Sequence, residues 1–156
     1  DRLLSRGLGD VYKRQVTIGM SDAKFGFSET RIGITPAQIA RYVLQKCGYS
    51  TGRRLMVTAA RFKGDEAGRL GVLDFVAEDA DALEGLENKV KRDVLECAPG
   101  AVAACKALII GMPATPDSEK VEFAAMNFSG CLQGEEGREG VASFVEKRKP
   151  NWHTEI

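Results

Sequence analysis

The sequence offers few of the residues that metal and disulfide sites require. Its 156 residues include one histidine, His153, near the C-terminus, and four cysteines, none of them in a C-x-x-C pair. Clustered ligands of the kind that hold zinc are absent, so we predict no metal site. We interpret the cysteines as buried free thiols of a protein in the reducing cytoplasm. They are Cys47, Cys97, Cys105 and Cys131.

A net charge and long apolar runs are also missing. The chain has 22 Lys and Arg residues and 22 Asp and Glu residues, so no overall field attracts nucleic acid or anionic lipid. No apolar run approaches the ~20 residues of a membrane span, and the N-terminus lacks the apolar stretch of a secretory signal. We therefore expect neither a membrane nor a nucleic acid as partner. Hydrophobic residues make up 44% of the chain, which is enough for a folded core.

The first fifteen residues differ in character from the rest. Residues 1–15 read D-R-L-L-S-R-G-L-G-D-V-Y-K-R-Q, which is basic and has an apolar spacing that fits neither a helix nor a strand. We expect this segment to be an extraneous leader, such as a translated adapter or assembly remnant. The alternative is a natural amphipathic leader. The fold prediction therefore starts at Val16.

Residues 16–77 alternate between short strands and helices. Val16 to Met20 is apolar and β-branched, which is typical of a buried strand. Pro36 suits the first turn of a helix and Gly48 suits its end. The other predicted elements are an extended piece at 24–27, helices at 37–47, about 51–60 and 63–70, and a strand at 72–77. This alternation predicts an α/β arrangement.

Residues 78–156 contain helical patterns and no strand pattern. The predicted helices cover residues 79–97, a segment that starts at Pro99, residues 117–132 and residues 136–147. Their apolar faces are larger than a lone helical tail needs. We therefore expect a partner surface over this region.

Four motifs resemble the enoyl-CoA hydratase/isomerase (crotonase) superfamily, and the similarity runs from Val16 to the end. Their order and spacing carry the resemblance more than any one of them does. They are A-K-F-G-F-S-E-T-R-I-G-I-T-P (23–36), R-L-M-V-T-A-A-R-F-K-G-D-E-A-G-R-L-G-V-L-D-F-V (54–76), E-C-A-P-G-A-V-A-A-C-K (96–106) and E-E-G-R-E-G-V-A-S-F-V-E-K-R-K-P-N-W (135–152).

The resemblance implies the C-terminal part of a spiral of ββα turns, followed by a helical region. Residues 16–77 would form the partial spiral with the active-site segment. Residues 78–156 would form the region that binds CoA and packs trimers, or dimers of trimers. The implied partner is an acyl-CoA substrate, and no cofactor is needed because the substrate itself carries coenzyme A.

Glu29 is the candidate catalytic residue. In the family, two glutamates flank one water that adds to an α,β-unsaturated thioester, and two backbone N–H groups hold the thioester oxygen. By its place in F-G-F-S-E, Glu29 matches the second glutamate. The apolar side chains Phe25, Phe27 and Ile32 are compatible with a pocket around it. From the residues alone, a solvated loop carboxylate would be the preferred interpretation of Glu29, and the resemblance favours the catalytic one.

The sequence departs from the family in two ways. Many relatives have P-G-A-G-G-T where this chain has P-A-Q-I-A-R. Pro36, Ala37 and Gln38 are candidate substrate-binding residues, and Ala37, Gln38 and Ile39 would narrow the space where those glycines lie and so shape a different acyl pocket. Together with S-E-T, this stretch resembles members that act on branched methylglutaconyl- or isohexenylglutaconyl-CoA. The glycine-rich loop with the first glutamate, and both oxyanion-hole amides, lie upstream of Val16 in the family. We therefore expect this chain alone to be inactive in hydration.

The last predicted helix carries the candidate CoA-binding residues. Phe144 and Lys147 are three positions apart and so share a helix face. In the family, an aromatic residue and a lysine at these places reach the adenosine-phosphate part of CoA. Arg148 and Lys149 would add positive charge. A solvated basic helix end is the alternative, and a solvated face is also expected for Arg53 and Arg54.

Other functions remain open on the same residues. One alternative is another acyl-CoA reaction on this fold, such as enoyl-CoA isomerisation or thioester hydrolysis. The other is a non-catalytic assembly protein or RNA-binding relative, against which the net charge of zero argues.

Overall fold

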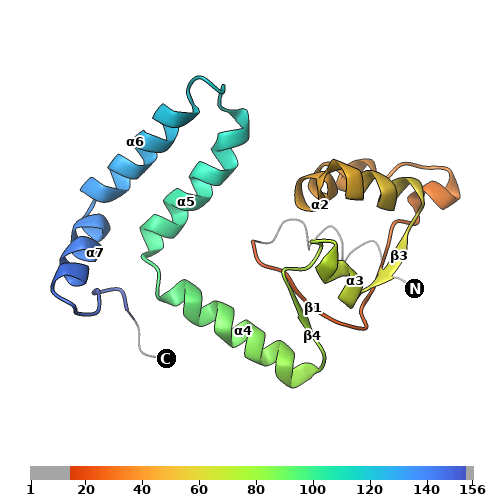
Figure 1. Cartoon of the computed structure of the whole chain (residues 1–156), viewed down its shortest axis with the longest axis horizontal. Coiled ribbons are helices and arrows are strands. Elements are labelled where there is room, and N and C mark those ends of the chain that lie inside the picture. Colours follow the sequence, from red (N-terminus) through yellow and green to blue (C-terminus); the bar gives the residue numbers. More distant parts are fainter. Residues whose placement is uncertain (1–14, 154–156) are drawn as a thin grey trace. The chain divides into compact units, whose positions relative to one another are not determined.

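The computed structural model describes residues 15–153, and within them the chain divides into two compact units between Asn88 and Lys89. We describe each unit by itself (Figure 1). The predicted leader, residues 1–15, lies outside the described residues except for Gln15. The predicted division after residue 77 falls at the end of a strand, whereas the two compact units meet inside a helix.

The first unit contains two small sheets. Strand β1 (Ile18–Met20) pairs in parallel with β4 (Phe75–Ala77), and β2 (Lys24–Gly26) pairs antiparallel with β3 (Arg61–Lys63). Helix α3 (Gly64–Arg69) lies between β3 and β4 in sequence and contacts both. Strands and helices thus alternate, and the predicted α/β class is confirmed.

Thr17 ties the parallel pair of strands to helix α2 (Ala37–Val57). Its backbone N–H and its hydroxyl both donate to Oδ2 of Asp74, at 2.7 and 2.6 Å. The ammonium group of Lys46 on α2 donates to the Thr17 hydroxyl at 2.7 Å and to the same carboxylate at 3.1 Å. Burial raises the pKa of Asp74, but the hydrogen bonds from Thr17 and Lys46 outweigh it, so that the pKa is lowered overall.

The core of the first unit lies under α2 and α3. Phe27, Val43 and Leu55 are 1%, 0% and 0% exposed. The rings of Phe25 and Phe62 stack at a centroid distance of 5.7 Å on the inner face of the β2–β3 pair. The other members of the core cluster are Phe62, Ala67, Val72 and Leu73. Apolar side chains from all parts of the unit therefore meet in one cluster.

Gly48 breaks α2 into two helical segments, as predicted. Its backbone has φ 75° and ψ 163°, outside the helical region, and glycine adopts a positive φ at little cost. The second segment, predicted to run to about residue 60, ends at Val57. Gly71 has φ 73° and follows α3, in agreement with the predicted end of that helix.

The second unit is helical throughout its described part. Helix α4 (Ala80–Leu95) crosses from the first unit, and α5 (Pro99–Gly111), the short 3₁₀ helix η2 (Met112–Ala114), α6 (Lys120–Gln133) and α7 (Glu135–Val145) follow. Helices α5, α6 and α7 pack against one another (Figure 1). No single helix among the described residues is long and apolar enough to span a membrane.

Three predictions about the fold were wrong in detail. Strand β3 was not predicted, because R-F-K is too short to show a period and has two basic residues. The strand predicted at 72–77 is reduced to Phe75–Ala77, since Val72 and Leu73 turn into the core instead. All four cysteines are free thiols, but Cys97 and Cys105 are exposed. Burial raises the pKa of Cys47, and the nearby Lys46 opposes that shift.

Candidate active site

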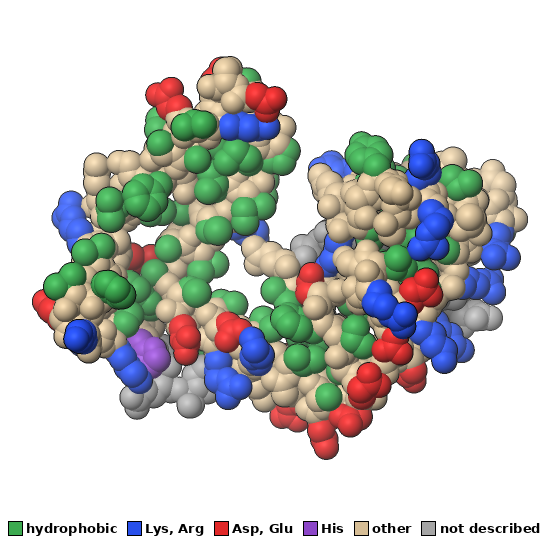
Figure 2. Space-filling view, in the orientation of Figure 1, with side chains coloured by type: hydrophobic (Ala, Val, Ile, Leu, Met, Phe, Trp, Pro, Cys, Tyr) green, Lys and Arg blue, Asp and Glu red, His purple; other side chains and the backbone are tan. Residues whose placement is uncertain are grey.

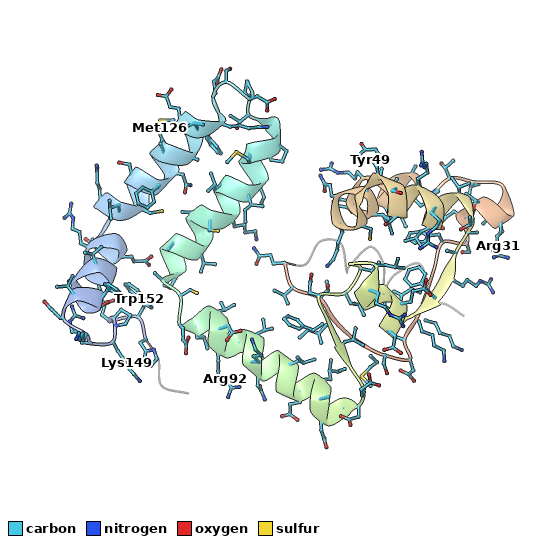
Figure 3. The ribbon with its side chains drawn as sticks, in the orientation of Figure 1. Arg31, Tyr49, Arg92, Met126, Lys149 and Trp152 are labelled. Carbon is cyan, nitrogen blue, oxygen red and sulfur yellow. The ribbon has the colours of Figure 1, made fainter. Side chains whose placement is uncertain are left out.

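Glu29 begins a short 3₁₀ helix, η1 (Glu29–Ile32), that follows strand β2. Gly33 ends this helix with φ 81°, a conformation that favours glycine. Two side chains anchor η1 to the end of α2. The Thr30 hydroxyl donates to the carbonyl of Met56 at 3.1 Å, and Arg31 (labelled in Figure 3) donates from Nη2 to the carbonyl of Ala59 at 3.3 Å.

Glu29 lines a pocket of about 420 Å³ together with Ile34, Thr35, Pro36, Ala37, Gln38 and Ile39. The structure thus brings together four of the residues predicted for the active site, from two elements that are adjacent in sequence. Ile34, Pro36 and Ile39 provide apolar surface, whereas Thr35 and Gln38 provide polar groups. The pocket is therefore mixed in character, as a site that positions a polar reacting group within an apolar wall would be.

One oxygen of the Glu29 carboxylate is shielded from solvent, and no described residue gives it a hydrogen bond in place of water. Oε2 is buried and has no hydrogen-bond partner among the described residues. A buried polar atom without a partner costs about 1–3 kcal/mol, so such atoms are rare and concentrate at functional sites. This oxygen is therefore available as a proton acceptor within a partly dehydrated environment.

The first turn of α2 supplies the neighbouring hydrogen-bond donors. The Pro36 carbonyl accepts hydrogen bonds from the N–H groups of Ile39 and Ala40 at 3.1 and 2.9 Å, which starts the helix. The N–H groups of Ala37 and Gln38 belong to the first turn, where no intrahelical acceptor exists. Both residues line the pocket. A carboxylate oxygen and helix-end donors at one pocket can together hold and deprotonate a small polar molecule.

The aromatic and apolar neighbours expected around Glu29 lie elsewhere. Phe25 stacks on Phe62, and Phe27 is buried in the core. Ile32 is 73% exposed. None of the three lines the Glu29 pocket, because β2 directs its phenylalanines toward the core. Ile34, Thr35 and Ile39 take their place. The sequence signal for Ile34 and Thr35 was their position between Glu29 and the predicted helix start, and that for Ile39 was its place in the first turn of this helix.

The C-terminal candidate residues are exposed. Phe144 on α7 is 84% exposed. Lys147 was expected inside this helix but follows its end, with a positive φ of 54°. The N–H groups of Lys147 and Arg148 close the helix by donating to the carbonyls of Phe144 and Ser143. Phe144 and Lys147 therefore share a helix terminus rather than a helix face.

Arg148 does not add a free positive charge to this end. Its guanidinium contacts both oxygens of Glu139 at 2.6 and 2.8 Å, and Nε donates to Glu146 at 2.6 Å. The hydrogen bonds from Arg148 hold the pKa of Glu139 at about 2. The same contacts raise the pKa of Arg148 above its ordinary value. Arg148 is thus occupied within its own unit, contrary to the predicted positive patch.

The remaining titratable residues form no second cluster of this type. Among residues 15–153, no group of three or more His, Cys, Asp and Glu side chains is arranged to hold a metal ion. Arg53 and Arg54 are exposed on α2 and line a shallow depression with Ser50, Thr51, Val57 and Thr58. The Glu29 pocket is therefore the strongest candidate for chemistry in the described part of the chain.

Comparison with known proteins finds relatives over most of the chain. The family profile described as enoyl-CoA hydratase/isomerase matches residues 15–155. The enoyl-CoA hydratase ACTT6 of Alternaria alternata is 31% identical over 139 residues, which are 88% of this chain and 46% of that protein. The short-chain-enoyl-CoA hydratase of Clostridium acetobutylicum is 31% identical over 140 residues, or 86% of this chain and 51% of that protein.

Solved structures give the same result. Pseudomonas aeruginosa AtuE superimposes with a TM-score of 0.92 at 43% identity, covering 97% of this chain and 59% of that chain. An enoyl-CoA hydratase/isomerase from Marinobacter aquaeolei has a TM-score of 0.90 at 34% identity, covering 97% and 58%. The chain spans about half the length of the curated relatives that it matches. By its profile match, its relatives and its fold, the chain belongs to the enoyl-CoA hydratase/isomerase family.

Proposed function

We propose that this chain supplies one catalytic carboxylate, Glu29, to an enzyme that adds water across the double bond of an enoyl-CoA thioester. The observation that carries the proposal is the buried, unpartnered Oε2 at the pocket that also holds Ala37 and Gln38. Its support from relatives is that several are named enoyl-CoA hydratases. Since the chain spans about half of their length, we propose that it does not catalyse hydration alone.

In the proposed reaction Glu29 moves a proton between water and the substrate. As the water oxygen forms its bond to C3, Oε2 takes a proton from the water, and the electron pair of the double bond moves toward the thioester oxygen. The protonated Glu29 then gives this proton to C2 of the enolate, which restores both the thioester and the carboxylate. By the resemblance, the family's first glutamate and two oxyanion-hole amides complete this machinery, and none of them belongs to the motifs of this chain.

The test is a hybrid protein in which the first part of AtuE precedes residues 16–156. We expect it to consume crotonyl-CoA, with loss of the enoyl thioester absorbance. Glu29→Gln keeps the shape of the side chain but removes the base, and should lower kcat by about 10²–10⁴-fold. Glu78→Gln, an exposed carboxylate after β4, is the matched control. An unchanged rate in Glu29→Gln would exclude the catalytic role, and a faster reaction with a 3-enoyl-CoA would favour isomerisation.

We propose further that the acyl group is branched, of the 3-methylglutaconyl or isohexenylglutaconyl type. The support is the P-A-Q-I stretch, whose residues Pro36 to Ile39 line the Glu29 pocket. Gln38→Gly should change the ratio of kcat/KM between 3-methylglutaconyl-CoA and crotonyl-CoA. A ratio that does not change would remove Gln38 from the acyl pocket without affecting the role of Glu29.

We propose that Phe144 and Lys147 contact the adenosine-phosphate part of CoA. Both are exposed, and Lys147 keeps an uncommon backbone conformation, a feature that concentrates at functional positions. In the hybrid protein, Lys147→Gln should raise KM for the acyl-CoA and leave kcat unchanged. Arg138→Gln on the same helix is the control, because it removes one exposed positive charge without touching the helix end.

We propose that copies of the protein associate with one another through the apolar helices of the second unit. Helix α5 has one charged residue, Lys106, and no buried residue, whereas helices that are apolar all round are normally buried. An apolar groove of about 800 Å³ lies along α5, α6 and α7 and is continued by Trp152. Figure 2 shows apolar side chains gathered over α5 and α6. Sedimentation equilibrium of the hybrid protein should give trimers or dimers of trimers.

A further inference from the structure

The antiparallel pair β2–β3 separates its side chains into two chemically distinct faces. Lys24 lies opposite Lys63, Phe25 opposite Phe62 and Gly26 opposite Arg61. Because side chains alternate along a strand, the two phenylalanines share one face, which packs on the core. Lys24, Lys63 and Arg61 share the other face with Gly26, and the three cations are exposed.

Gly26 lies close to Arg61 and lines a pocket together with the three cations. A Cβ atom added there would lie 3.3 Å from Cγ of Arg61, so a larger residue would fill the space beside the guanidinium. A pocket of about 430 Å³ occupies this place. Its lining consists of Lys24, Phe25, Gly26 and Ser28 from one strand and its extension, and Arg61, Phe62 and Lys63 from the other. None of these residues is acidic, and none of them lines the Glu29 pocket.

This arrangement is unfavourable without an anion. Directly opposed side chains on an antiparallel pair are about 5 Å apart at Cβ, and like charges in that position are destabilising. None of the three cations makes a salt bridge or a side-chain hydrogen bond with a described residue. Three positive charges therefore line one small pocket without a neutralising partner among residues 15–153. Lys and Arg side chains are visible along this side of the unit in Figure 2.

We propose that the face formed by Lys24, Arg61 and Lys63 binds the phosphate group of a small molecule, at a site separate from the Glu29 pocket. A phosphate group carries up to two negative charges, which matches two opposed ammonium groups. Its oxygens can also accept two parallel hydrogen bonds from a guanidinium. The Ser28 hydroxyl at the rim of the pocket is a further donor. Phe25 is half-buried against the core and also lines the pocket, which favours a ligand with apolar surface next to its phosphate.

The experiment titrates the full 156-residue chain with inorganic phosphate, and separately with ADP, at an ionic strength held constant with KCl. We expect a saturable rise in the midpoint of thermal unfolding, and shifts of the Gly26 and Arg61 amide signals in NMR spectra. Tighter binding of ADP would identify a nucleotide phosphate as the source, and equal binding would identify free phosphate. A response no larger than that to KCl alone would overturn the proposal.

Variants test the assignment of the site. Lys24→Gln with Lys63→Gln should weaken phosphate binding by at least about tenfold, since the variant removes two of the three charges that face the ligand. The same double variant should unfold at a higher temperature without phosphate, because the opposed like charges are gone. Lys24→Glu, which faces Lys63 with the opposite charge, should keep the fold and abolish binding. Lys106→Gln on α5 is the matched control; equal weakening by this variant would overturn the proposal.

Discussion

The two units of this chain have similar amounts of apolar sequence but bury it to different extents. In the first unit, nine hydrophobic residues are buried, and all of them lie between Phe27 and Ala77. Between residues 89 and 153, Ser143 is the only residue in the buried class. Exposed apolar side chains there include Ile109, Ile110, Val121, Met126 and Phe128. Helical periodicity alone therefore does not predict burial, because burial also requires a surface to pack against.

The difference follows from the connectivity of each unit. In the first unit, strands paired across 35 to 57 residues of sequence bring α2 and α3 onto one cluster. In the second unit, each helix packs mainly on its neighbours in sequence, and three helices in that arrangement leave faces open. The second unit also carries the candidate CoA-binding residues, whereas the first carries the candidate base.

The largest expected difference between the units is in the free energy of unfolding that is lost when a leucine is shortened to alanine. Leu55→Ala removes a side chain that is 0% exposed and should lower the free energy of unfolding by about 3 kcal/mol. Leu132→Ala in the second unit starts from 46% exposure and should cost about 1 kcal/mol or less in dilute solution. Urea unfolding monitored by circular dichroism measures both. An equal loss in the two variants would contradict the contrast; a loss in Leu132→Ala that grows with protein concentration would support self-association.

The next effect concerns the close approach of backbones in the first unit. A Cβ atom on Gly64 would lie 1.8 Å from the Met20 carbonyl oxygen. Gly64→Ala should therefore destabilise this unit by about 2 kcal/mol, as overpacking does. Gly85, inside α4, has no atom within 4 Å of such a Cβ, so Gly85→Ala should raise stability by about 0.5–1 kcal/mol. In thermal unfolding, we therefore expect Gly64→Ala to lower the unfolding temperature and Gly85→Ala to raise it.

In the second unit, a carboxylate from one helix caps another. Both oxygens of Glu136 on α7 accept N–H groups from the first turn of α5, those of Gly100 and Ala101, each at 3.0 Å. Glu136→Ala should cost about 1 kcal/mol, the usual cost of a lost helix cap. Glu135→Ala, one position earlier and exposed, should cost less. Amide exchange at residues 100–104 is the local measurement, and unchanged protection there would show that the cap does not hold α5.

The smallest expected effect is a dependence of the second unit on acid. Glu139 has a folded-state pKa of about 2, below its ordinary 4.5, because Arg148 stabilises the charged form. Its contribution to stability should be complete above pH 4.5 and should disappear as the pH falls toward 2. Helix content at residues 135–145, followed by NMR from pH 6 to 2, tests this. In Arg148→Gln the carboxyl should titrate near its ordinary pKa.

Four features were predictable from the sequence alone: the family, the α/β class, the helix break at Gly48 and the grouping of Glu29 with Pro36, Ala37 and Gln38. These depend on local chemistry: glycine at positive φ, a proline at a helix start, and residues too close in sequence to be far apart in space. Glu29 retains its role as a proposal, but the pocket walls were assigned to the wrong side chains. Phe25 and Phe27 were expected there because they are adjacent to Glu29 in sequence.

Which apolar residues are buried and which charges are neutralised could be seen only in the tertiary structure. Strand β3 exists because β2 pairs with it, and that pairing directs Phe25 to the core and places Lys24 opposite Lys63. Arg148 is neutralised because the chain after α7 places its guanidinium against the carboxylate of Glu139 on that helix. Such outcomes depend on contacts between residues distant in sequence, whose energies no local pattern contains. Burial in particular requires two surfaces in contact, and the sequence of a single helix describes only one of them.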